Sequence, residues 1–144
     1  MRIVDLEPDD ARLAADVLPV LAELRTHLTA ESLAAVYAEG FPQGLRFTAV
    51  YDDEETRCLG VAGWRVVATT NVLRKLYVDD LVTRTDARST GVGHFLLADL
   101  EKRASRAGCA IIDLDSGVQR HAAHRFYFRE GMYISSHHFA VRLS

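Results

Sequence analysis

The chain has 144 residues, 49% of them apolar and 26% charged, and this length and composition suit one soluble globular domain with a single core. A formal net charge of −3 gives no indication of a nucleic-acid-binding protein, although a mild acidic excess is compatible with a cationic substrate. Asp5 comes too early for a signal peptide, and no apolar run is long enough for a membrane span, so we expect a cytoplasmic protein without a membrane partner.

The first forty residues predict one strand and two helical segments. Arg2–Leu6 reads as the strand, and Pro8–Asp10 marks a helix start. Apolar residues then recur at helical spacing, namely Leu13, Val17, Leu21, Leu24 and Leu28. Pro19 interrupts this pattern and must kink the helix or divide it into two pieces.

A second helix is expected to begin after Thr29, whose side chain can cap it, and to end at Gly40. Its apolar face consists of Leu33, Val36 and Tyr37. A loop over Gly40–Gly44 separates this helix from a region of strand character. Three strands are expected there, over Leu45–Tyr51, Cys58–Thr69 and Val72–Val82, and the polar turn Asp52–Thr56 makes the first two a hairpin.

The remaining residues alternate between helices and strands. Gly91–Ala107 is a strongly amphipathic helix with apolar positions at Val92, Phe95, Leu96, Leu100 and Ala104. Cys109–Leu114 is apolar apart from one aspartate and reads as a short strand buried on both faces. A helix over Arg120–Glu130 and two closing strands, Met132–Ser136 and His137–Leu143, complete the order. This order predicts a mixed α/β layer architecture in a single domain over residues 1–144.

The two cysteines, Cys58 and Cys109, lie far apart in apolar runs without a CxxC spacing. We therefore expect two buried thiols in a reducing compartment rather than a disulfide.

The loop Arg84–Thr90 and the helix start that follows it have the features of a phosphate cradle. A helix N-terminus offers unpaired N–H groups and a partial positive charge, and Gly91 and Gly93 allow a phosphate to approach the backbone closely. Arg88 adds a cation at the mouth of this cradle. The Walker pattern is absent from the sequence, and Leu96 occupies the third glycine position of the dinucleotide fingerprint, so both of those nucleotide sites are disfavoured.

The spacing Arg88-x-x-Gly91-x-Gly93 resembles the acetyl-CoA loop of the GNAT N-acetyltransferase superfamily. The flanking segments match as well, and the resemblance is sharpest over Tyr77–Leu143. The matching flanking segments are Leu76–Val82 before the loop and, after it, Ile111–Leu114, Ala123–Tyr127 and Arg129–Met132. The resemblance implies an acetyl-CoA-dependent N-acetyltransferase with a central, mostly antiparallel sheet, a parallel pair of strands at the cofactor cleft and flanking helices.

By the same resemblance, the backbone of Leu81, Val82 and Thr83 would bind the pantetheine arm and the acetyl group, as an added strand pairs with a sheet edge. The backbone N–H groups of the cradle would hold the pyrophosphate, from residues Arg88, Ser89, Thr90, Gly91, Val92, Gly93 and His94. Many members carry Asn three residues before the alanine that matches Ala123. Here that residue is Arg120. We expect both Arg120 and Ala123 at the cofactor, with Arg120 reaching a different group of it from the one that Asn contacts.

Two side chains are expected to act in catalysis. Tyr127 matches the family tyrosine that points at the cofactor sulfur, and a neutral phenol can donate a proton to a thiolate. Asp80 matches the acidic residue that serves as a base on the central strand. The neighbouring Asp79 should point to the opposite face of a regular strand. Each residue also has a structural interpretation: Tyr127 as a core aromatic residue, and Asp80 as a carboxylate bonded to neighbouring backbone.

The histidines indicate no metal. His121 and His124 share one helix face, but no further ligands are apparent, which favours a solvated surface. His137 and His138 are adjacent on an expected strand, so they point to opposite faces and cannot both line one site. Acetyl-CoA, which the resemblance implies, is the one cofactor expected.

The sequence leaves open which compound accepts the acetyl group. The run from Gln119 to Gly131 is similar to bacterial aminoalkylphosphonate N-acetyltransferases, but it lies in the cofactor-binding half. Our first hypothesis is a small-molecule primary amine; a protein N-terminus or lysine, and a non-catalytic CoA-binding sensor, are the alternatives. Glu23, Glu31 and Glu39 could attract an ammonium group. A homodimer is expected from the habit of the family alone.

Overall fold

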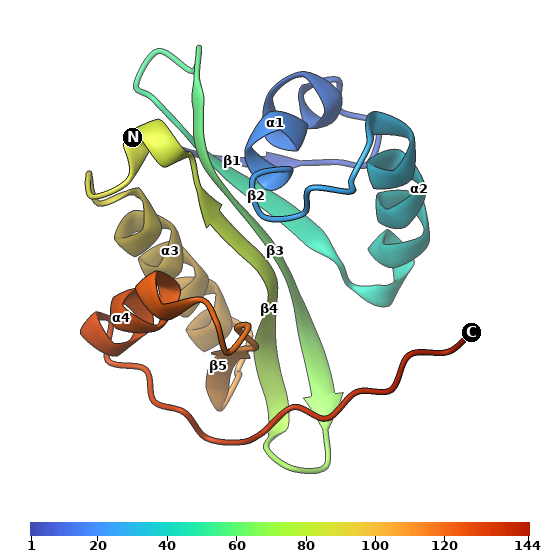
Figure 1. Ribbon diagram of the computed structural model, residues 1–144, viewed down its shortest axis with the longest axis vertical. Coiled ribbons are helices and arrows are strands. Elements are labelled where there is room, and N and C mark those ends of the chain that lie inside the picture. Colours follow the sequence, from blue (N-terminus) through green and yellow to red (C-terminus); the bar gives the residue numbers. More distant parts are fainter. The chain divides into compact units, whose positions relative to one another are not determined.

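A five-stranded sheet forms the frame of the computed structural model, which describes all residues 1–144 (Figure 1). Its strand order follows the sequence: β1 (Arg2–Leu6), β2 (Arg46–Tyr51), β3 (Cys58–Thr69), β4 (Leu73–Thr83) and β5 (Ile111–Leu114). The first four strands pair antiparallel, and β4 and β5 form a parallel pair. The predicted mixed α/β sheet is therefore confirmed.

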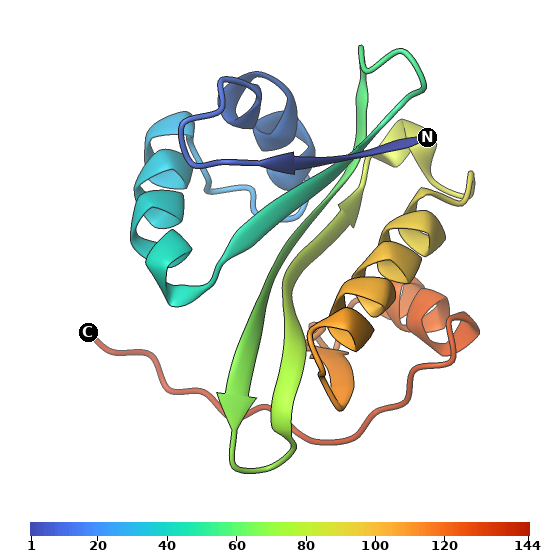
Figure 2. The ribbon, with the colours of Figure 1, turned by 180° about the vertical axis from the view of Figure 1, so that it is seen from behind.

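The chain divides into two compact units, Met1–Asp113 and Leu114–Ser144. In the first unit, helices cover both faces of the sheet, as Figures 1 and 2 show. On one face lie the π-helical turn η1 (Leu13–Val17), α1 (Leu18–Leu21) and α2 (Ala30–Gly40). On the other face lies α3 (Val92–Arg106). Two short 3-10 turns, η2 (Phe41–Gln43) and η3 (Thr85–Ala87), connect these elements.

Pro19 divides the first helical segment, as the sequence predicts. The π-helical turn gives way to α1 at Leu18, and Pro19 stands in the first turn of α1, where its missing N–H needs no acceptor. Thr29 caps α2 by accepting a hydrogen bond from the N–H of Ser32 at 3.1 Å, and the Ser32 hydroxyl returns a bond to the Thr29 N–H.

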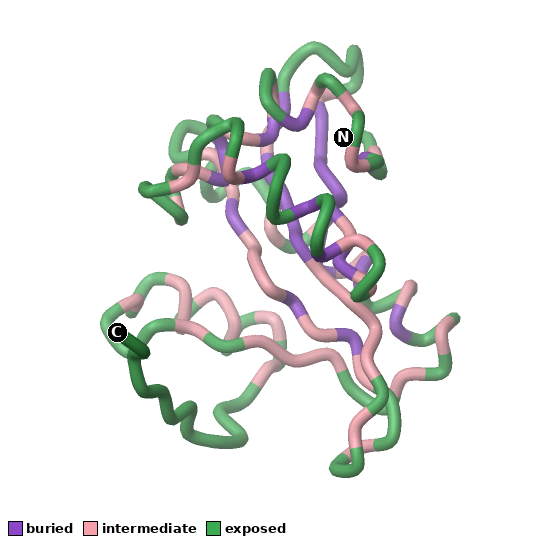
Figure 3. Tube along the Cα trace, turned by 90° about the vertical axis from the view of Figure 1, so that its right-hand side faces the viewer, coloured by how far each residue is buried: buried purple, intermediate pink, exposed green.

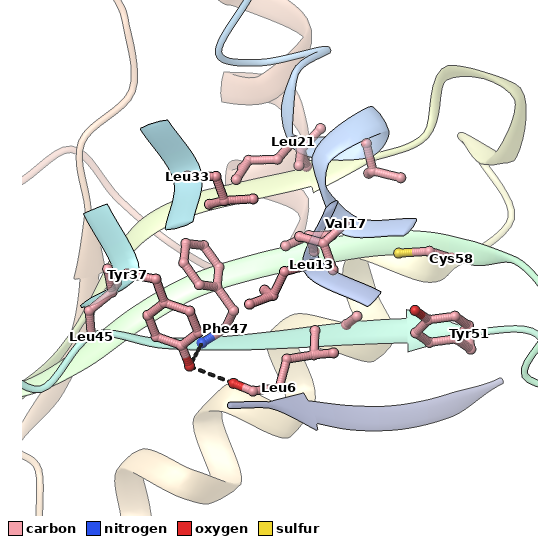
Figure 4. Packing of buried hydrophobic residues seen from close by; sticks show 14 residues of the cluster. Leu6, Leu13, Val17, Leu21, Leu33, Tyr37, Leu45, Phe47, Tyr51 and Cys58 are labelled. Carbon is pink, nitrogen blue, oxygen red and sulfur yellow. Dashed lines mark hydrogen bonds between the residues drawn. The ribbon is translucent and has the colours of Figure 1, made fainter. Parts of the chain in front are cut away.

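The core of the first unit lies between these N-terminal helices and the sheet (Figure 4). Tyr37 is fully buried there because its hydroxyl has two backbone partners: it donates to the carbonyl of Leu6 and accepts from the N–H of Phe47. Leu24 and Leu28 follow the end of α1 and still pack against the core, so their apolar character is explained without a longer helix. Val36, which the spacing places on the same face of α2 as Leu33 and Tyr37, is 49% exposed.

Strand β5 is less buried than the sequence predicts. Ile111 is 38% exposed, and the other three residues are half-buried. The prediction of a strand buried on both faces is therefore wrong, because β5 is the last strand of the sheet and has no neighbour beyond it. Both cysteines are free thiols, with Cys58 buried and Cys109 half-buried.

The second unit contains one helix, α4 (His121–Arg129). The predicted strands Met132–Ser136 and His137–Leu143 are wrong: residues 132–144 have no regular secondary structure, and Figure 3 shows residues 133–144 exposed. Their apolar character fits a strand, but a strand also needs a partner for its N–H and C=O groups, and no strand of the sheet pairs with this segment. The exposed apolar side chains of this segment are Tyr133, Ile134, Phe139, Val141 and Leu143.

The longest helix, α3, has 15 residues, and none of the helices is both long and apolar enough to cross a membrane.

Candidate active site

A β-bulge interrupts β4 next to its acidic pair. Gly63 of β3 pairs with Asp80, but the next residue, Trp64, pairs with Val78, so Asp79 is an extra residue in β4. A bulge bends its strand and changes the direction of the side chains around it. The regular alternation that should send Asp79 and Asp80 to opposite faces therefore does not hold at this point.

Asp80 is a largely buried carboxylate with one cationic partner. Its side chain is 15% exposed, and Arg25 donates from Nε to Oδ1 at 2.7 Å. Burial raises the pKa of Asp80, and the hydrogen bond and charge of Arg25 oppose that rise. Gly63 leaves the room for this carboxylate, because a Cβ there would lie 3.1 Å from Oδ2.

Asp79 has a separate partner. Arg65 of β3 holds it with two hydrogen bonds, from Nε and from Nη2, each 3.0 Å long. Arg25 also donates from Nη2 to the main-chain carbonyl of Asp79 at 3.1 Å. The bulge therefore gathers two carboxylates and two guanidinium groups, and their formal charges balance.

The C-terminal end of β4 has one free edge. Leu81, Val82 and Thr83 pair with β3 on one side. On the other side, β5 has four residues and starts beside the beginning of β4, where Ala110 donates to the carbonyl of Arg74 at 2.8 Å and Lys75 binds Asp113 at 2.9 Å. Backbone groups at the end of β4 can therefore pair with an extended ligand.

The helix start after β4 has the features predicted for a phosphate cradle. Gly91 is the N-cap residue of α3 with φ +87°, no side chain caps the helix, and Phe95 makes the first helical hydrogen bond back to Gly91. The N–H groups of Val92, Gly93 and His94 therefore belong to the first turn, which has no acceptor within the helix. A Cβ built on Gly91 meets nothing within 4 Å, so the space beside this residue is open.

The loop that leads to the cradle is held on both sides. Arg57 and Arg84 bind the carboxylate of Asp86, while Glu23 accepts from the N–H and the hydroxyl of Thr85. Glu23 is therefore engaged at the end of β4, whereas Glu31 and Glu39 lie exposed on α2. Arg88 is exposed, and Ser89 and Thr90 complete the loop; Ser89 has a φ of +63°.

The remaining predicted residues lie together in the second unit. Arg120 is the N-cap residue of α4, Ala123 lies in its first turn and Tyr127 two turns along. Burial raises the pKa of the half-buried Tyr127, and the charge of Arg120 and its hydrogen bond to the phenol oppose the rise. Arg120, which stands where many family members carry Asn, therefore binds the side chain of Tyr127.

The histidines have local partners. His124 Nε2 lies 2.8 Å from the carbonyl of Gly117, its ring meets that of His121 edge to face, and His138 lies 3.4 Å from the carboxylate of Asp115. Trp64 donates from its indole nitrogen to Thr48 at 2.9 Å, which makes it part of the sheet packing.

Sequence reasoning missed Arg25 and Arg65. Arg25 follows α1 and is 55 positions from Asp80, and no spacing rule connects two residues so far apart. The one available signal was chemical: a carboxylate in an apolar strand needs a partner.

Comparison with known proteins identifies the family. The model of the acetyltransferase (GNAT) family matches residues 16–132. An uncharacterised N-acetyltransferase of Bacillus subtilis, YhdJ, is 36% identical over 114 residues, which are 78% of this chain and 79% of the relative. The aminoalkylphosphonate N-acetyltransferase of Salmonella typhimurium is 30% identical over 147 residues, with coverage of 88% and 93%.

Solved structures confirm the fold. An acetyltransferase of Trypanosoma brucei has a TM-score of 0.79 at 20% identity, with 99% of each chain covered. The ribosomal-protein-alanine N-acetyltransferase of Brucella melitensis has a TM-score of 0.81 at 14% identity, with 99% of this chain and 100% of the other covered. The matched family model and the two curated relatives together show that the chain belongs to the GNAT family and is an acetyl-CoA-dependent N-acetyltransferase.

Proposed function

We propose that residues 1–144 act as one acetyltransferase domain that transfers the acetyl group of acetyl-CoA to a primary amine of a small molecule, by direct attack in a ternary complex. One observation carries this proposal. The largely buried carboxylate of Asp80 stands at the β4 bulge, directly before the three residues whose backbone forms the open strand edge.

The residues present fit acetyl-CoA. Leu81, Val82 and Thr83 would pair with the pantetheine arm along the open edge of β4. The N–H groups from Arg88 to His94 would hold the pyrophosphate, since no side chain caps the start of α3 and the positive end of the helix dipole lies there. The Arg88 guanidinium is exposed beside this turn and adds a positive charge. Arg120 and Ala123 of α4 are assigned to the cofactor in the same proposal.

Acetyl-CoA supplies an activated acyl group, the thioester. Asp80 accepts the proton of the amine while the nitrogen lone pair forms the N–C bond to the carbonyl carbon. The C–S bond breaks, and the electron pair leaves with sulfur as a thiolate. Tyr127 donates its phenol proton to that sulfur, and the raised pKa of Tyr127 keeps the phenol protonated at neutral pH.

The small-molecule acceptor is supported by the Salmonella relative, whose name gives an aminoalkylphosphonate as the compound it acetylates. The test is a panel of small amines and of peptides with free N-termini and lysines, each mixed with acetyl-CoA and the protein. We expect acetylation of small amines. Acetylation of peptides alone would make the protein a peptide acetyltransferase, and tight acetyl-CoA binding without any acetylation would make it a sensor.

We also propose that the protein forms a homodimer. The exposed apolar residues of the segment 132–144, among them Phe139, Val141 and Leu143, give it the alternation of a strand that lacks a partner. A second copy can supply that partner. We expect the mass of a dimer by light scattering and the mass of a monomer for the variant Phe139→Glu/Val141→Glu. A monomeric wild-type protein would contradict this proposal.

A further inference from the structure

Arg25 covers the carboxylate that the proposed reaction uses. Its Nε donates to Asp80 Oδ1 and its Nη2 to the main-chain carbonyl of Asp79, so the guanidinium spans the bulge. The Arg25 side chain is 46% exposed whereas that of Asp80 is 15% exposed. We expect an amine that reaches Asp80 to lie close to this guanidinium.

The backbone holds Arg25 in this place. Its N–H donates to the carbonyl of Leu21 at 2.9 Å, and its own carbonyl accepts from the N–H of Leu28 at 3.0 Å. The apolar side chains of Leu24 and Leu28 pack against the core on either side of it. The segment between α1 and α2 is therefore fixed over the end of β4, and Arg25 is a built part of this surface.

The charges around Arg25 indicate what kind of amine fits. Arg25 and Arg65 balance Asp79 and Asp80, so the cluster is neutral before an acceptor arrives. A simple ammonium ion beside Arg25 would bring two like charges together and leave the half-buried cluster with an excess positive charge. An acceptor that carries its own anionic group keeps the cluster neutral.

Arg25 also has the donors to bind such a group. Asp80 and Asp79 use Nε and Nη2, which leaves the Nη1 amino group for another acceptor. Guanidinium N–H groups suit the geometry of carboxylate and phosphonate oxygens. Arg65 differs from Arg25 in two respects: its side chain is only 24% exposed, against 46% for Arg25, and it binds Asp79 and not Asp80.

We infer that Arg25 is the specificity-determining residue for the acceptor, and that it binds an anionic substituent a few bonds from the amine that Asp80 deprotonates. This inference deepens the proposed function and rests on it. The acceptor class is then a short amine bearing a phosphonate or a carboxylate. The guanidinium takes the anion while the neighbouring Asp80 takes the proton.

The test compares amines of equal length that differ in charge: 2-aminoethylphosphonate and 3-aminopropanoate against propylamine. We expect wild-type protein to favour at least one of the anionic amines by about 10- to 100-fold in kcat/KM, the value of a hydrogen bond to a charged group. Arg25→Gln should reduce that ratio to within a few-fold of one. Arg65→Gln removes the same charge from the cluster but keeps the Arg25 donors, so it should lower the ratio much less. The larger of the two wild-type ratios identifies the anion.

An equal loss of rate for the charged and the neutral amines in Arg25→Gln would overturn the inference, because Arg25 would then act as a structural partner of Asp80 alone. A wild-type protein without preference would overturn it too. Binding of methylphosphonate, measured by competition against the amine and by calorimetry, gives a second readout that Arg25→Gln should abolish and Arg65→Gln should only weaken. If wild-type protein acetylates no amine, the proposed function fails, and methylphosphonate binding still decides the role of Arg25.

Discussion

Gly63 and Asp80 face each other across β3 and β4, and the missing side chain of the glycine gives the carboxylate its place. A Cβ on Gly63 would lie 3.1 Å from Asp80 Oδ2 and 2.9 Å from the ring of Phe47, so the position admits no larger residue without displacement of one of them. The bulge beside this pair, the burial of Asp80 and its bond to Arg25 therefore form one local arrangement that shields most of the Asp80 carboxylate from water.

Replacement of Asp80 by Asn should remove the base. We expect kcat to fall by about 10²- to 10⁴-fold, the usual contribution of a positioned general base, while acetyl-CoA affinity changes little. Steady-state kinetics and calorimetry measure the two quantities. An Asn variant with wild-type turnover would show that Asp80 is a structural carboxylate.

The pH profile of the wild-type enzyme should carry the mark of Asp80. Because burial raises its pKa above the ordinary 3.8, the acid limb of kcat/KM should lie above that value, and the rate should rise with pH as the carboxylate ionises. Arg25 now lowers this pKa, so Arg25→Gln should move the limb to higher pH. A limb that stays in place would contradict the role of Arg25 at Asp80. The sign for folding follows: a raised native pKa stabilises the fold below the ordinary pKa, and this contribution is lost as the pH rises through the raised value.

Gly91 and Gly108 allow a matched test of the phosphate cradle. Both have positive φ, +87° and +73°, both leave open space around a built Cβ, and they stand near opposite ends of α3. Alanine at either position should cost about 1–2 kcal/mol in backbone strain. Only Gly91→Ala should also weaken acetyl-CoA binding, by about tenfold, and Gly93→Val should weaken it by crowding the N–H groups. Equal affinities for the Gly91 and Gly108 variants in calorimetry would place the cradle elsewhere.

Tyr127→Phe should separate catalysis from binding. The variant loses the phenol proton but keeps the ring, so we expect turnover to fall by about 10²-fold while acetyl-CoA affinity stays within a few-fold. Unchanged turnover would remove the acid role from Tyr127. Arg120→Ala is the companion variant: loss of its hydrogen bond and charge should raise the Tyr127 pKa further, which ultraviolet titration of the phenol can follow.

The two cysteines should differ in reactivity. Burial raises the pKa of the Cys58 thiol to about 12, whereas Cys109 lies half-buried before β5. Thiolates, not thiols, react with iodoacetamide, so Cys58 should stay unmodified in the native protein while Cys109 is alkylated. Peptide mapping by mass spectrometry reads both sites. Rapid native alkylation of Cys58 would contradict the burial of β3.

Local sequence patterns predicted much of the fold. The bounds of β3 agree with the structure residue for residue, Thr29 caps α2, and Pro19 stands at the change from η1 to α1. Each of these features depends on neighbours in sequence: a polar turn, a capping hydroxyl or a missing N–H. The amphipathic pattern over Gly91–Ala107 likewise placed the start of α3 within one residue.

The errors arise where structure depends on distant partners. The segments after Met132 have strand composition but no pairing strand, and β5 is exposed because of its place at the end of the sheet. The bulge at Asp79 follows from pairing with β3, and periodicity within β4 gives no sign of it. Arg25 lies 55 positions before Asp80 in the sequence, so sequence analysis predicted the carboxylate and missed its partner.

The most direct test of the account is the stoichiometry of acetyl transfer in a single reaction. Wild-type protein is mixed with acetyl-CoA and 2-aminoethylphosphonate, and released CoA thiol and N-acetylated amine are quantified together by thiol titration and mass spectrometry. We expect equal amounts of both products from the wild-type protein and almost none from Asp80→Asn. If the protein binds acetyl-CoA but releases no CoA thiol with this or any other small amine, the central claim is contradicted.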